Sequence, residues 1–447
     1  MYAGKNILVC GMAKSGISAA LLLKEKGANV TLQDLKTKES FGDLSYIEDK
    51  GITLYMGKNP DDIIENQDMI VLSPGIPCDL GFIEKAKELG KEVTGEIEIG
   101  YSLCPCPVAA ITGTNGKTTT TTLTGEIFKA YCNTAVVGNI GIPYTGEVSK
   151  LDENSIAVLE ASSFQLETIK TFKAHIAAVL NITPDHLNRH KTLETYIAMK
   201  ERVFENQDEN DFLILNYEDE ACRDMANRAK SKVFWFSSSR ELEKGIYLKD
   251  GNIIVKWDNF NGVLININDI KILGVHNYEN VMAAAAIALC GNVPVETIVS
   301  VIKEFKGVEH RIEYCGSPNG VDYYNDSKGT NPDASIKAVM AMVKPIVLIG
   351  GGYDKKADYT DWVKTFEGRV KNIVLIGETA QDIKKCCLEN GFEAVTVCVT
   401  FEEAVEKCAE IAKEGDCVLL SPACASWGMF DNFEQRGDLF KELVSKM

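Results

Sequence analysis

A glycine-rich stretch at residues 113–119 sets the strictest condition on the fold of this 447-residue chain. The stretch reads GTNGKTT and lies between an apolar, strand-like run at 107–112 and a helical run. Glycines allow such a loop to turn tightly, so that its backbone N–H groups and the start of the helix face an anion. A strand, a loop of this kind and a helix in that order are typical of parallel α/β sheets. The chain is therefore predicted to be an α/β protein with a phosphate-binding loop.

The same loop indicates its ligand. Lys117 adds a positive point charge beside the phosphates, and the Thr118 hydroxyl is placed to ligate a Mg²⁺ ion held by the nucleotide. The general pattern has a glycine five residues before Gly116, where this chain has Ile111. The alternative is a glycine turn that opens an ordinary helix, but the strand, loop and helix together favour ATP or a close relative. The predicted ATP-binding residues in the loop are Gly113, Thr114, Asn115, Gly116, Lys117, Thr118 and Thr119.

Strand-like and helical runs alternate along nearly the whole chain, which predicts α/β units throughout. We expect three such domains in series. A Rossmann-like domain over residues 1–94 precedes a central P-loop ATPase-type domain over residues 95–306. A second Rossmann-like domain over residues 307–447 follows, after a linker at Lys306-Gly307.

A weaker phosphate signal lies in the first domain. The sequence after the strand-like run 6–10 is close to the dinucleotide pattern G-x-G-x-x-G, but Ala13 stands at the second glycine. Asp34 ends the next strand, where a dinucleotide enzyme places its ribose-binding acid, and Ser73 would line the same crevice. Three interpretations stay open: a nicotinamide site, a site for another phosphorylated ligand such as a nucleotide sugar, and a purely structural turn.

Composition and charge exclude several classes of protein. The chain has 47 Lys and Arg residues against 64 Asp and Glu residues, a net charge of −17, and such a surface repels the phosphate backbone of nucleic acids. The longest apolar run, 281–290, is shorter than the roughly 18–20 residues that cross a bilayer. There is no signal-peptide core. We therefore expect a cytoplasmic protein with neither nucleic acid nor membrane as a partner.

The 14 cysteines are scattered along the chain. Their closest spacings are Cys104/Cys106 and Cys386/Cys387, and no C-x-x-C pair occurs. Because the chain is long and lacks a secretory signal, free and mostly buried thiols are expected rather than a disulfide framework.

Side chains near two predicted strand ends are candidate metal ligands. Glu160 ends a strand-like run and His186 follows the next one, so both should lie at the edge of the sheet that carries the phosphate loop. Carboxylate oxygens suit Mg²⁺, whereas a lone histidine is more often a capped or core residue than a ligand. Lys200 lies on a helix predicted to begin near Thr192, where a solvated lysine is the ordinary expectation. If its nitrogen were carbamylated, the side chain would instead be an anion able to complete an oxygen shell around a metal.

Several longer segments resemble the Mur ligase family, and they extend over essentially the whole chain, from residue 7 to residue 440. The segments are GTNGKTT at 113–119, LEASSFQLE at 159–167, NITPDHLNRH at 181–190, Tyr196-x-x-x-Lys200, HNYEN at 276–280, His310-Arg311, NDSKGTN at 325–331 and SPACASWGMFDNFEQRGDLF at 421–440. The last of these is similar to the family member that adds D-glutamate.

The resemblance implies an ATP-dependent amide ligase of peptidoglycan precursor synthesis. Such an enzyme would join D-glutamate to the L-alanyl carboxylate of UDP-N-acetylmuramoyl-L-alanine and release ADP and phosphate. A carboxylate is a poor acylating agent, so ATP would first convert it into an acyl phosphate that the amine attacks. Positioning and electrostatic stabilisation by Lys117 and two Mg²⁺ ions would supply most of the catalysis. The expected partners are small-molecule substrates, and a monomer is expected.

The resemblance also implies a role for individual residues. The catalytic centre would contain Lys117, His186, Lys200 and Lys328, and the metal ligands would be Thr118, Glu160, His186 and carbamylated Lys200. Further contacts to ATP would come from Asn277, Asn280, Arg311 and Asp326. The UDP-linked substrate would contact Ser15, Asp34, Lys36, Ser73, Asn139, Ser162 and Gln165, with Asn139 able to contact phosphate as well. D-Glutamate would contact Thr330, Lys355, Ser426 and Phe433.

Some of these residues have a plainer interpretation. Arg311 and Lys328 could be surface charges, and Phe433 could be a core residue of a helix. The first domain departs from the family pattern at Ala13 and Lys14, and it has Lys36 where an arginine would also serve. These departures leave the individual UDP contacts open, but not the family.

Rival functions explain less of the sequence. A folylpolyglutamate synthase would not need the leading βαβ module, a diaminopimelate-adding ligase would show Asp-Asn-Pro-Arg, and an alanine-adding ligase would carry histidine at Asn115. A nicotinamide dehydrogenase explains only residues 5–34. A regulatory NTPase or binding module leaves Thr330, Lys355 and Ser426 without a purpose.

Overall fold

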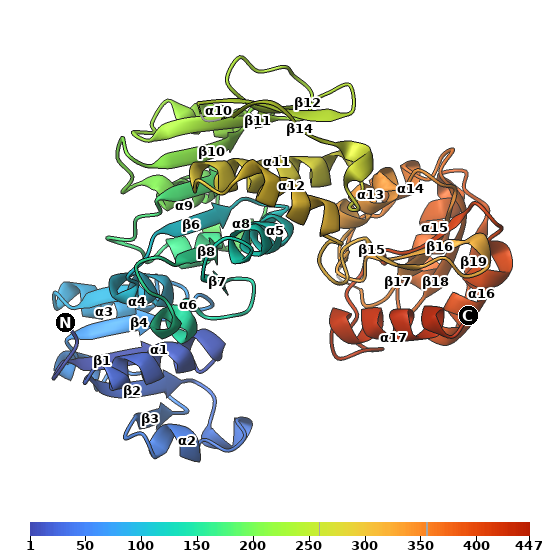
Figure 1. Cartoon of the computed structure of the whole chain (residues 1–447). Helices are drawn as coiled ribbons and strands as arrows, with labels where there is room; N and C mark the ends of the chain where they lie inside the picture. The colour runs from blue at the N-terminus through green and yellow to red at the C-terminus, as the bar shows by residue number, and fades with distance from the viewer. Residues whose placement is uncertain (259, 355) are drawn as a thin grey trace. The chain divides into compact units, whose positions relative to one another are not determined.

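The structure is a computed structural model that describes residues 1–258, 260–354 and 356–447. Its contacts divide the chain into two compact units (Figure 1). The first unit contains residues 1–267 and 279–302, and the second contains residues 268–278 and 303–447. Among the described residues, no helix combines the length and the apolar character needed to cross a membrane.

The first unit begins with a parallel five-stranded sheet in the order β3-β2-β1-β4-β5, drawn in blue in Figure 1. Its strands are β1 (Asn6–Cys10), β2 (Asn29–Asp34), β3 (Thr53–Met56), β4 (Met69–Leu72) and β5 (Glu92–Gly95). The helices of this region are α1 (Lys14–Glu25), α2 (Ser45–Glu48), α3 (Gly81–Glu88) and α4 (Glu96–Leu103). Strand β4 is buried at every position, as expected for the continuous apolar run of a central parallel strand.

A nine-stranded sheet in the order β14-β13-β12-β11-β10-β9-β6-β8-β7 follows in the same unit. Its strands are β6 (Val108–Thr112), β7 (Thr134–Gly138), β8 (Ile156–Glu160), β9 (Ile176–Val179), β10 (Phe212–Asn216), β11 (Lys232–Ser237), β12 (Gly245–Lys249), β13 (Asn252–Trp257) and β14 (Phe260–Asn266). Pairing is parallel from β7 to β12, and the last two strands are antiparallel. The helices from here to the second unit's sheet are α5 (Lys117–Lys129), α6 (Tyr144–Glu147), α7 (Ser163–Leu166), α8 (Leu187–His190), α9 (Leu193–Glu201), α10 (Glu220–Ala226), α11 (Val275–Cys290) and α12 (Val295–Glu304).

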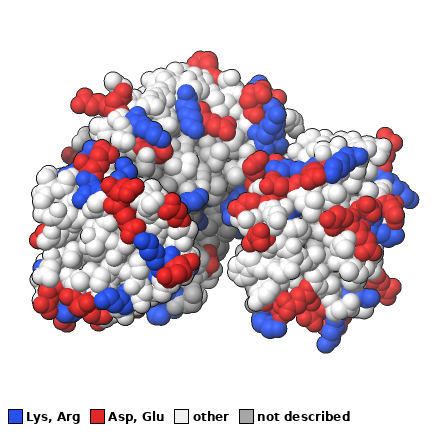
Figure 2. Space-filling view, turned by 90° about the horizontal axis from the view of Figure 1, so that it is seen from below, with Lys and Arg blue, Asp and Glu red and all other residues white. Residues whose placement is uncertain are grey.

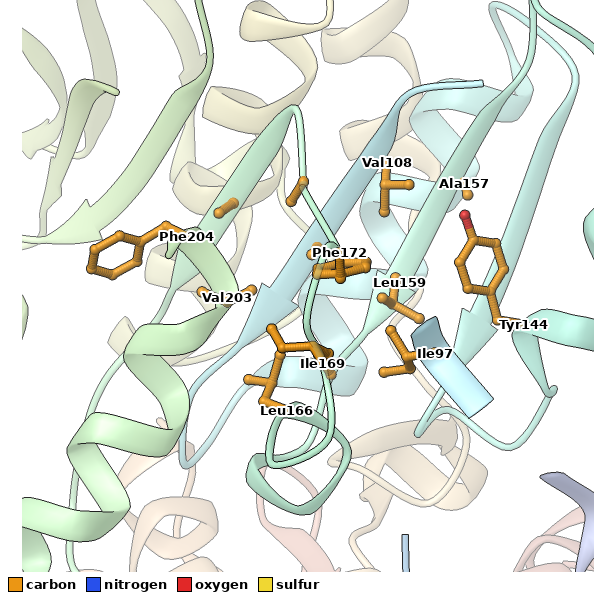
Figure 3. Close-up of a cluster of buried hydrophobic side chains, with 14 of the residues drawn as sticks. Ile97, Val108, Tyr144, Ala157, Leu159, Leu166, Ile169, Phe172, Val203 and Phe204 are labelled. Atoms are coloured by element: carbon orange, nitrogen blue, oxygen red, sulfur yellow. The ribbon is translucent and has the colours of Figure 1, made fainter. Parts of the chain in front are cut away.

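A shared hydrophobic core explains why these two sheets form one unit (Figure 3). Val108 of β6 and Leu159 of β8 belong to the same buried cluster as Ile97, which lies on α4 after the first sheet. Leu166 and Phe172 from the segment after β8 join the cluster. Removing this apolar surface from water stabilises the contact between the first sheet's last helix and the central sheet.

The second unit contains a six-stranded sheet in the order β15-β16-β20-β17-β18-β19. Its strands are β15 (Glu313–Gly316), β16 (Asp322–Asn325), β17 (Ile346–Gly351), β18 (Val370–Ile376), β19 (Val395–Val397) and β20 (Cys417–Leu420). Only β15 is antiparallel to its neighbour. The helices are α13 (Pro332–Ala341), α14 (Thr360–Lys364), α15 (Ala380–Glu389), α16 (Phe401–Ile411) and α17 (Phe433–Ser445).

Both faces of this sheet are covered by apolar residues. Ile346 and Leu348 of β17 belong to one buried cluster, whereas Val347 and Ile349 belong to another. Because successive side chains of a strand point to opposite faces, the alternation places one cluster on each side of the sheet. The strand is buried on both faces, which is the doubly covered arrangement of parallel sheets.

The predicted fold class is confirmed, with α/β sheets in series. The antiparallel strands β12 to β14 were not predicted. The domain boundaries at 94/95 and 306/307 stay a prediction. All 14 cysteines lie among the described residues and are free thiols, as expected. On the face drawn in Figure 2, Lys and Arg side chains lie among Asp and Glu side chains rather than in one large basic patch.

Candidate functional site

The phosphate loop lies between β6 and α5, as the sequence predicts. Gly113 and Gly116 have φ values of 144° and 85°, a region that side chains with a Cβ rarely occupy. A Cβ at Gly116 would also lie 2.2 Å from Oδ1 of Asn280, on α11. The Asn280 Oδ1 accepts a hydrogen bond from the Thr120 hydroxyl at 3.3 Å. Both glycines are therefore required by the backbone, and Asn280 lies against the loop.

The segment after β9 holds the loop in shape. The backbone N–H of Thr114 donates to the Asn181 carbonyl at 2.9 Å, and that of Asn115 donates to Asn181 Oδ1 at 2.8 Å. The Thr114 hydroxyl donates to the Thr183 carbonyl at 3.1 Å. Asn181 was part of a motif in the sequence but had no predicted role. It fixes the loop from outside, before any ligand binds.

Two lysine amines meet at one carbonyl oxygen of the loop. Lys117 Nζ donates to the carbonyls of Gly113 and Thr114 at 3.0 and 2.9 Å, and Lys200 Nζ donates to the Gly113 carbonyl at 2.7 Å. Lys200 lies on α9 and is 1 % exposed. Burial, and next the positive charge of Lys117, lower the pKa of Lys200 to about 6, although Asp185 and Glu160 oppose the shift. The Lys200 amine is therefore mostly neutral at pH 7, and because the side chain is buried, the solvated-lysine interpretation is wrong.

Glu160 ends β8 as a buried carboxylate that is only partly satisfied. It is 1 % exposed, and its Oε1 accepts a hydrogen bond from Asn139 Nδ2 at 2.9 Å. Its Oε2 is buried and has no hydrogen-bond partner among the described residues. A Cβ at Gly138 would lie 2.3 Å from the Glu160 carbonyl, so only glycine lets β7 approach here. A buried anionic oxygen without a donor is a ready ligand for a cation.

His186 lies on the surface, in the segment after β9, at the same edge of the sheet as Glu160. Its φ of 53° is left-handed, its N–H donates to Asp185 Oδ1 at 2.8 Å, and its side chain is 49 % exposed. The ring packs on Phe164 with centroids 4.9 Å apart. Among the described residues, no three His, Cys, Asp or Glu side chains gather as a metal-holding group. Glu160 and His186 are the two residues of these types in the predicted ligand set.

Ser162 and Gln165 hold each other at the start of α7. The Ser162 hydroxyl and backbone N–H both donate to Gln165 Oε1, at 2.9 and 3.0 Å, and Gln165 N–H donates back to Ser162 Oγ. This reciprocal arrangement caps the helix. The two predicted substrate contacts thus already have a structural role.

The first sheet brings its predicted residues to one loop. Asp34 Oδ2 accepts the N–H of Met12 at 2.8 Å and its Oδ1 accepts the N–H of Lys36 at 2.9 Å. The Ser73 hydroxyl donates to the Gly11 carbonyl at 3.2 Å. Ser15 lies in the first turn of α1, directly after this loop. The carboxylate therefore organises the loop from β2.

Arg189, which the sequence did not single out, ties this region to the central sheet. Its guanidinium donates to the carbonyls of Pro74 and Ile76 at 3.0 and 3.1 Å. It also donates to both oxygens of Glu167, at 3.1 and 2.6 Å, and stacks over the Phe164 ring at 4.4 Å. Neither partner of the ion pair is more than 15 % exposed. The pair holds the loop after β4 against the segment that carries His186.

In the second unit, Asp326 is a buried acid at the edge of the sheet. Its Oδ2 accepts the Ser421 hydroxyl at 2.7 Å, and its N–H donates to the Leu420 carbonyl at 2.7 Å. Burial raises the pKa of Asp326 to about 7, against the hydrogen bond from Ser421 and the charge of Arg311. Arg311 is half-buried, and its charge acts on the pKa of Asp326. This argues against the interpretation of Arg311 as a plain surface charge.

A buried arginine organises the residues around it. Arg436 is 1 % exposed and donates to Oγ and the carbonyl oxygen of Ser327 at 2.9 and 2.7 Å. The Ser327 hydroxyl in turn donates to the Phe433 carbonyl at 2.8 Å. Lys328 Nζ lies 3.7 Å from the centre of the Phe433 ring. Phe433 thus packs under a cation at the start of α17 and is half-buried rather than a core residue. Arg436 had no predicted role, although its stretch carried the family resemblance.

The remaining predicted residues are placed as follows. Of the residues predicted to contact D-glutamate, Thr330 donates its N–H to the Lys328 carbonyl at 2.8 Å, and Ser426 is 4 % exposed. Asn277, predicted to contact ATP, donates from Nδ2 to the Leu273 carbonyl at 2.7 Å. Thr118 and Thr119 lie in the first turn of α5. Lys355 lies outside the described residues.

Three family descriptions match successive parts of this chain. The "Mur ligase MurD-like, N-terminal domain" matches residues 5–95, the "Mur ligase middle domain" matches residues 111–288, and the "Mur ligase, glutamate ligase domain" matches residues 310–424. These ranges together span most of the chain.

Named relatives are similar over the full length. A protein of Lachnoclostridium phytofermentans named UDP-N-acetylmuramoylalanine--D-glutamate ligase is 48 % identical over 99 % of this chain and 98 % of its own length. A protein of the same name from Clostridioides difficile is 45 % identical over 99 % of both chains. Among solved structures, UDP-N-acetylmuramate-alanine ligase MurC of Thermotoga maritima is 18 % identical, covers 99 % of both chains and superposes with a TM-score of 0.60. That likeness concerns the fold alone.

Proposed function

The chain belongs to the Mur ligase family, and on that premise we propose that it joins D-glutamate to UDP-N-acetylmuramoyl-L-alanine. ATP activates the L-alanyl carboxylate as an acyl phosphate, the amine of D-glutamate attacks it, and ADP and phosphate are released. The observation that carries the proposal is the combination in the first unit. There, a glycine loop, two converging lysines and a buried carboxylate meet at the ends of parallel strands. The names of relatives 45–48 % identical support the choice of amino acid.

The phosphate loop binds the ATP phosphates. The Lys117 amine donates to two carbonyls of its own loop, and phosphate oxygens would accept these hydrogen bonds more strongly because they are charged. The loop N–H groups and the start of α5 face the same anion. Positive charge at this point stabilises the negative charge that spreads over the transferred phosphoryl group.

The metal ligands are Thr118, Glu160, His186 and Lys200. The unsatisfied Oε2 of Glu160 supports this set, because a buried carboxylate oxygen needs a donor or a cation. Bound Mg²⁺ would neutralise charge on the phosphate and acyl oxygens. Asn139 holds the other oxygen of Glu160 and so fixes the direction in which Oε2 points.

Lys200 is the residue that we propose to be carbamylated. Its amine is buried, faces Lys117 and has Asp185 and Glu160 as its acidic neighbours. Only a neutral amine attacks CO₂, and the lowered pKa of Lys200 provides one at pH 7. The carbamate that forms is an anion, so it would add oxygen ligands for a cation where a protonated amine would repel it.

The substrate contacts are proposed as the family resemblance places them. Ser15, Asp34, Lys36 and Ser73 surround the loop after β1, at the carboxyl ends of parallel strands where nucleotides bind in such sheets. Asn139, Ser162 and Gln165 would contact the muramoyl end. D-Glutamate would be bound by Thr330, Lys355, Ser426 and Phe433. Asn277, Asn280, Arg311 and Asp326 would contribute further ATP contacts, with Lys328 a catalytic cation.

Trapping the acyl phosphate tests the proposed reaction. The protein is incubated with ATP, Mg²⁺ and UDP-N-acetylmuramoyl-L-alanine, with hydroxylamine in place of D-glutamate, and the hydroxamate is measured by mass spectrometry. We expect hydroxamate from the wild type, at least about a hundredfold less from Lys117→Met, and an unchanged yield from the matched surface variant Lys129→Met. Phosphate release without hydroxamate would contradict the acyl-phosphate route.

A further inference from the structure

Two cysteine side chains face each other in the segment between α4 and β6. This segment, Cys104-Pro105-Cys106, begins directly after α4, and the backbone of Cys104 is extended. Residues two apart in an extended stretch share a face. The Sγ atoms of Cys104 and Cys106 are accordingly 3.4 Å apart. A disulfide joins its sulfurs at about 2.05 Å, so bond formation needs an approach of about 1.4 Å.

The two thiols differ in exposure. Cys104 is half-buried, whereas Cys106 is 8 % exposed and belongs to the core cluster that includes Tyr144 and Val108, both labelled in Figure 3. The contact with the Cys106 thiol lowers the pKa of Cys104, against an opposing effect of burial, and the same contact raises the pKa of Cys106. Elsewhere burial raises the pKa of thiols such as Cys222 and Cys408. Cys104 is therefore the more accessible thiol and has the lower pKa of the two, and Cys106 lies behind it.

Both ends of the segment are held in place. Glu96 on α4 accepts the N–H of Thr145 at 2.7 Å. Glu98 on the same helix accepts the backbone N–H groups of residues 170, 171 and 172 at 2.7–3.0 Å. On the other side, Val108 begins a strand paired on both sides. The thiols are thus kept close by the fold rather than by chance rotation of a mobile loop.

We propose that Cys104 and Cys106 form a thiol–disulfide exchange site that reacts with low-molecular-weight disulfides. The Cys104 thiolate attacks one sulfur of the small disulfide, forms a mixed disulfide and releases one thiolate. The Cys106 thiol then loses its proton to solvent and attacks the Cys104 sulfur, which releases the second thiolate. The two protein thiols become one disulfide, and the small disulfide is reduced to two thiols.

The second close pair in the chain provides an internal comparison. Cys386 and Cys387 are neighbours on α15, and successive helical residues point about 100° apart. Cys387 is fully buried in a core cluster, whereas Cys386 lies near Thr360 and Asn390. We therefore expect no exchange across this pair.

Peptide mapping of the full-length protein tests the site. The protein is reduced, and the reductant is removed under anaerobic conditions. The protein is then incubated with glutathione disulfide, its remaining thiols are alkylated, and it is digested with trypsin. The tryptic peptide 92–117 contains Cys104 and Cys106 and no other cysteine. We expect this peptide to lose two hydrogens and to escape alkylation, while the cysteines of α15 are alkylated. Recovery of the peptide with both thiols alkylated, after other cysteines have reacted, would overturn the proposal.

Single variants separate the two steps. In Cys106→Ser the mixed disulfide with glutathione should accumulate at Cys104, because the resolving thiol is gone. In Cys104→Ser the modification of Cys106 should be at least about tenfold slower than that of the wild type, because the attacking thiolate is gone. Cys386→Ser should leave exchange in peptide 92–117 unchanged. Equal reactivity of Cys104→Ser and wild type would overturn the assigned order, and the wild-type peptide map decides the proposal if a variant fails to fold.

Discussion

Carbamylation of Lys200 should depend on pH in a way that reports the state of its amine. CO₂ adds to the neutral amine and releases one proton, so the ratio of carbamate to free lysine rises with CO₂ pressure, with pH and with the neutral fraction. For a pKa of about 6, that fraction is already near one above pH 7. For an ordinary lysine of pKa about 10.5, only about one amine in a thousand is neutral at pH 7.5.

The two cases give different slopes. With the lowered pKa of Lys200, the ratio should rise about tenfold per pH unit between pH 7 and 8, because only the released proton matters. An unshifted lysine would give about a hundredfold per unit, because its neutral fraction rises as well. At pH 7.5 the neutral fraction of the Lys200 amine is about a thousandfold larger than that of an ordinary lysine, which favours carbamylation of Lys200 over that of exposed lysines.

Carbon-13 NMR of metal-free protein under a fixed, low pressure of ¹³CO₂ measures this ratio. The signal assigned to Lys200 should be missing from Lys200→Met and present in Lys170→Met, which removes an exposed lysine. A hundredfold rise per pH unit, or a signal that survives in Lys200→Met, would refute the account of a buried neutral amine.

Three further changes test other parts of the site. Glu160→Gln should lower the rate of phosphate release at saturating substrates about a hundredfold, because the buried oxygen that would hold a cation loses its charge; an unchanged Mg²⁺ dependence would count against this role. Arg189→Ala should raise KM for the UDP-linked substrate about tenfold, with a smaller effect on kcat, because hydrogen bonds from a charged donor to the loop after β4 are lost; equal changes in both constants would assign Arg189 elsewhere. Asp326 has a raised pKa of about 7, so the stability that its neutral form supplies is complete below the unfolded pKa near 3.8 and is lost as the pH rises through 7. Between pH 6 and 8 the wild type should lose about 1.4 kcal/mol relative to Asp326→Asn in urea unfolding, and parallel pH profiles would contradict this.

The sequence predicted those parts of the site whose function is local. A phosphate loop is defined by residues adjacent in the chain, and the backbone of Gly113 and Gly116 has the conformation that such a loop needs. Glu160 was placed correctly because strand ends can be read from one apolar run. These inferences required only the order of strand, loop and helix.

Residues whose role depends on distant parts of the chain could not be assigned in this way. Asn181, Arg189 and Arg436 act through partners 66, 115 and 109 residues away. Burial of Lys200 likewise follows from the packing of α9 on the phosphate loop, which no local pattern of the helix indicates. Tertiary packing, rather than residue type, decides these roles.

One missed element did have a local signal. Strands β12 and β13 are joined by Asp250-Gly251, both with positive φ, which is the turn that favours a two-residue hairpin. This dipeptide indicates a hairpin at a point where continued α/β alternation was predicted. The antiparallel end of the central sheet could therefore have been predicted.

The most direct test of the proposed activity is phosphate release from ATP in the presence of UDP-N-acetylmuramoyl-L-alanine, Mg²⁺ and bicarbonate. D-Glutamate is compared with L-glutamate, L-lysine and glycine at equal concentrations. Release that depends on D-glutamate, with one phosphate for each amide formed, is the expected result. Equal release with L-glutamate or glycine, or none with D-glutamate, would contradict the assignment of this chain as a D-glutamate-adding ligase.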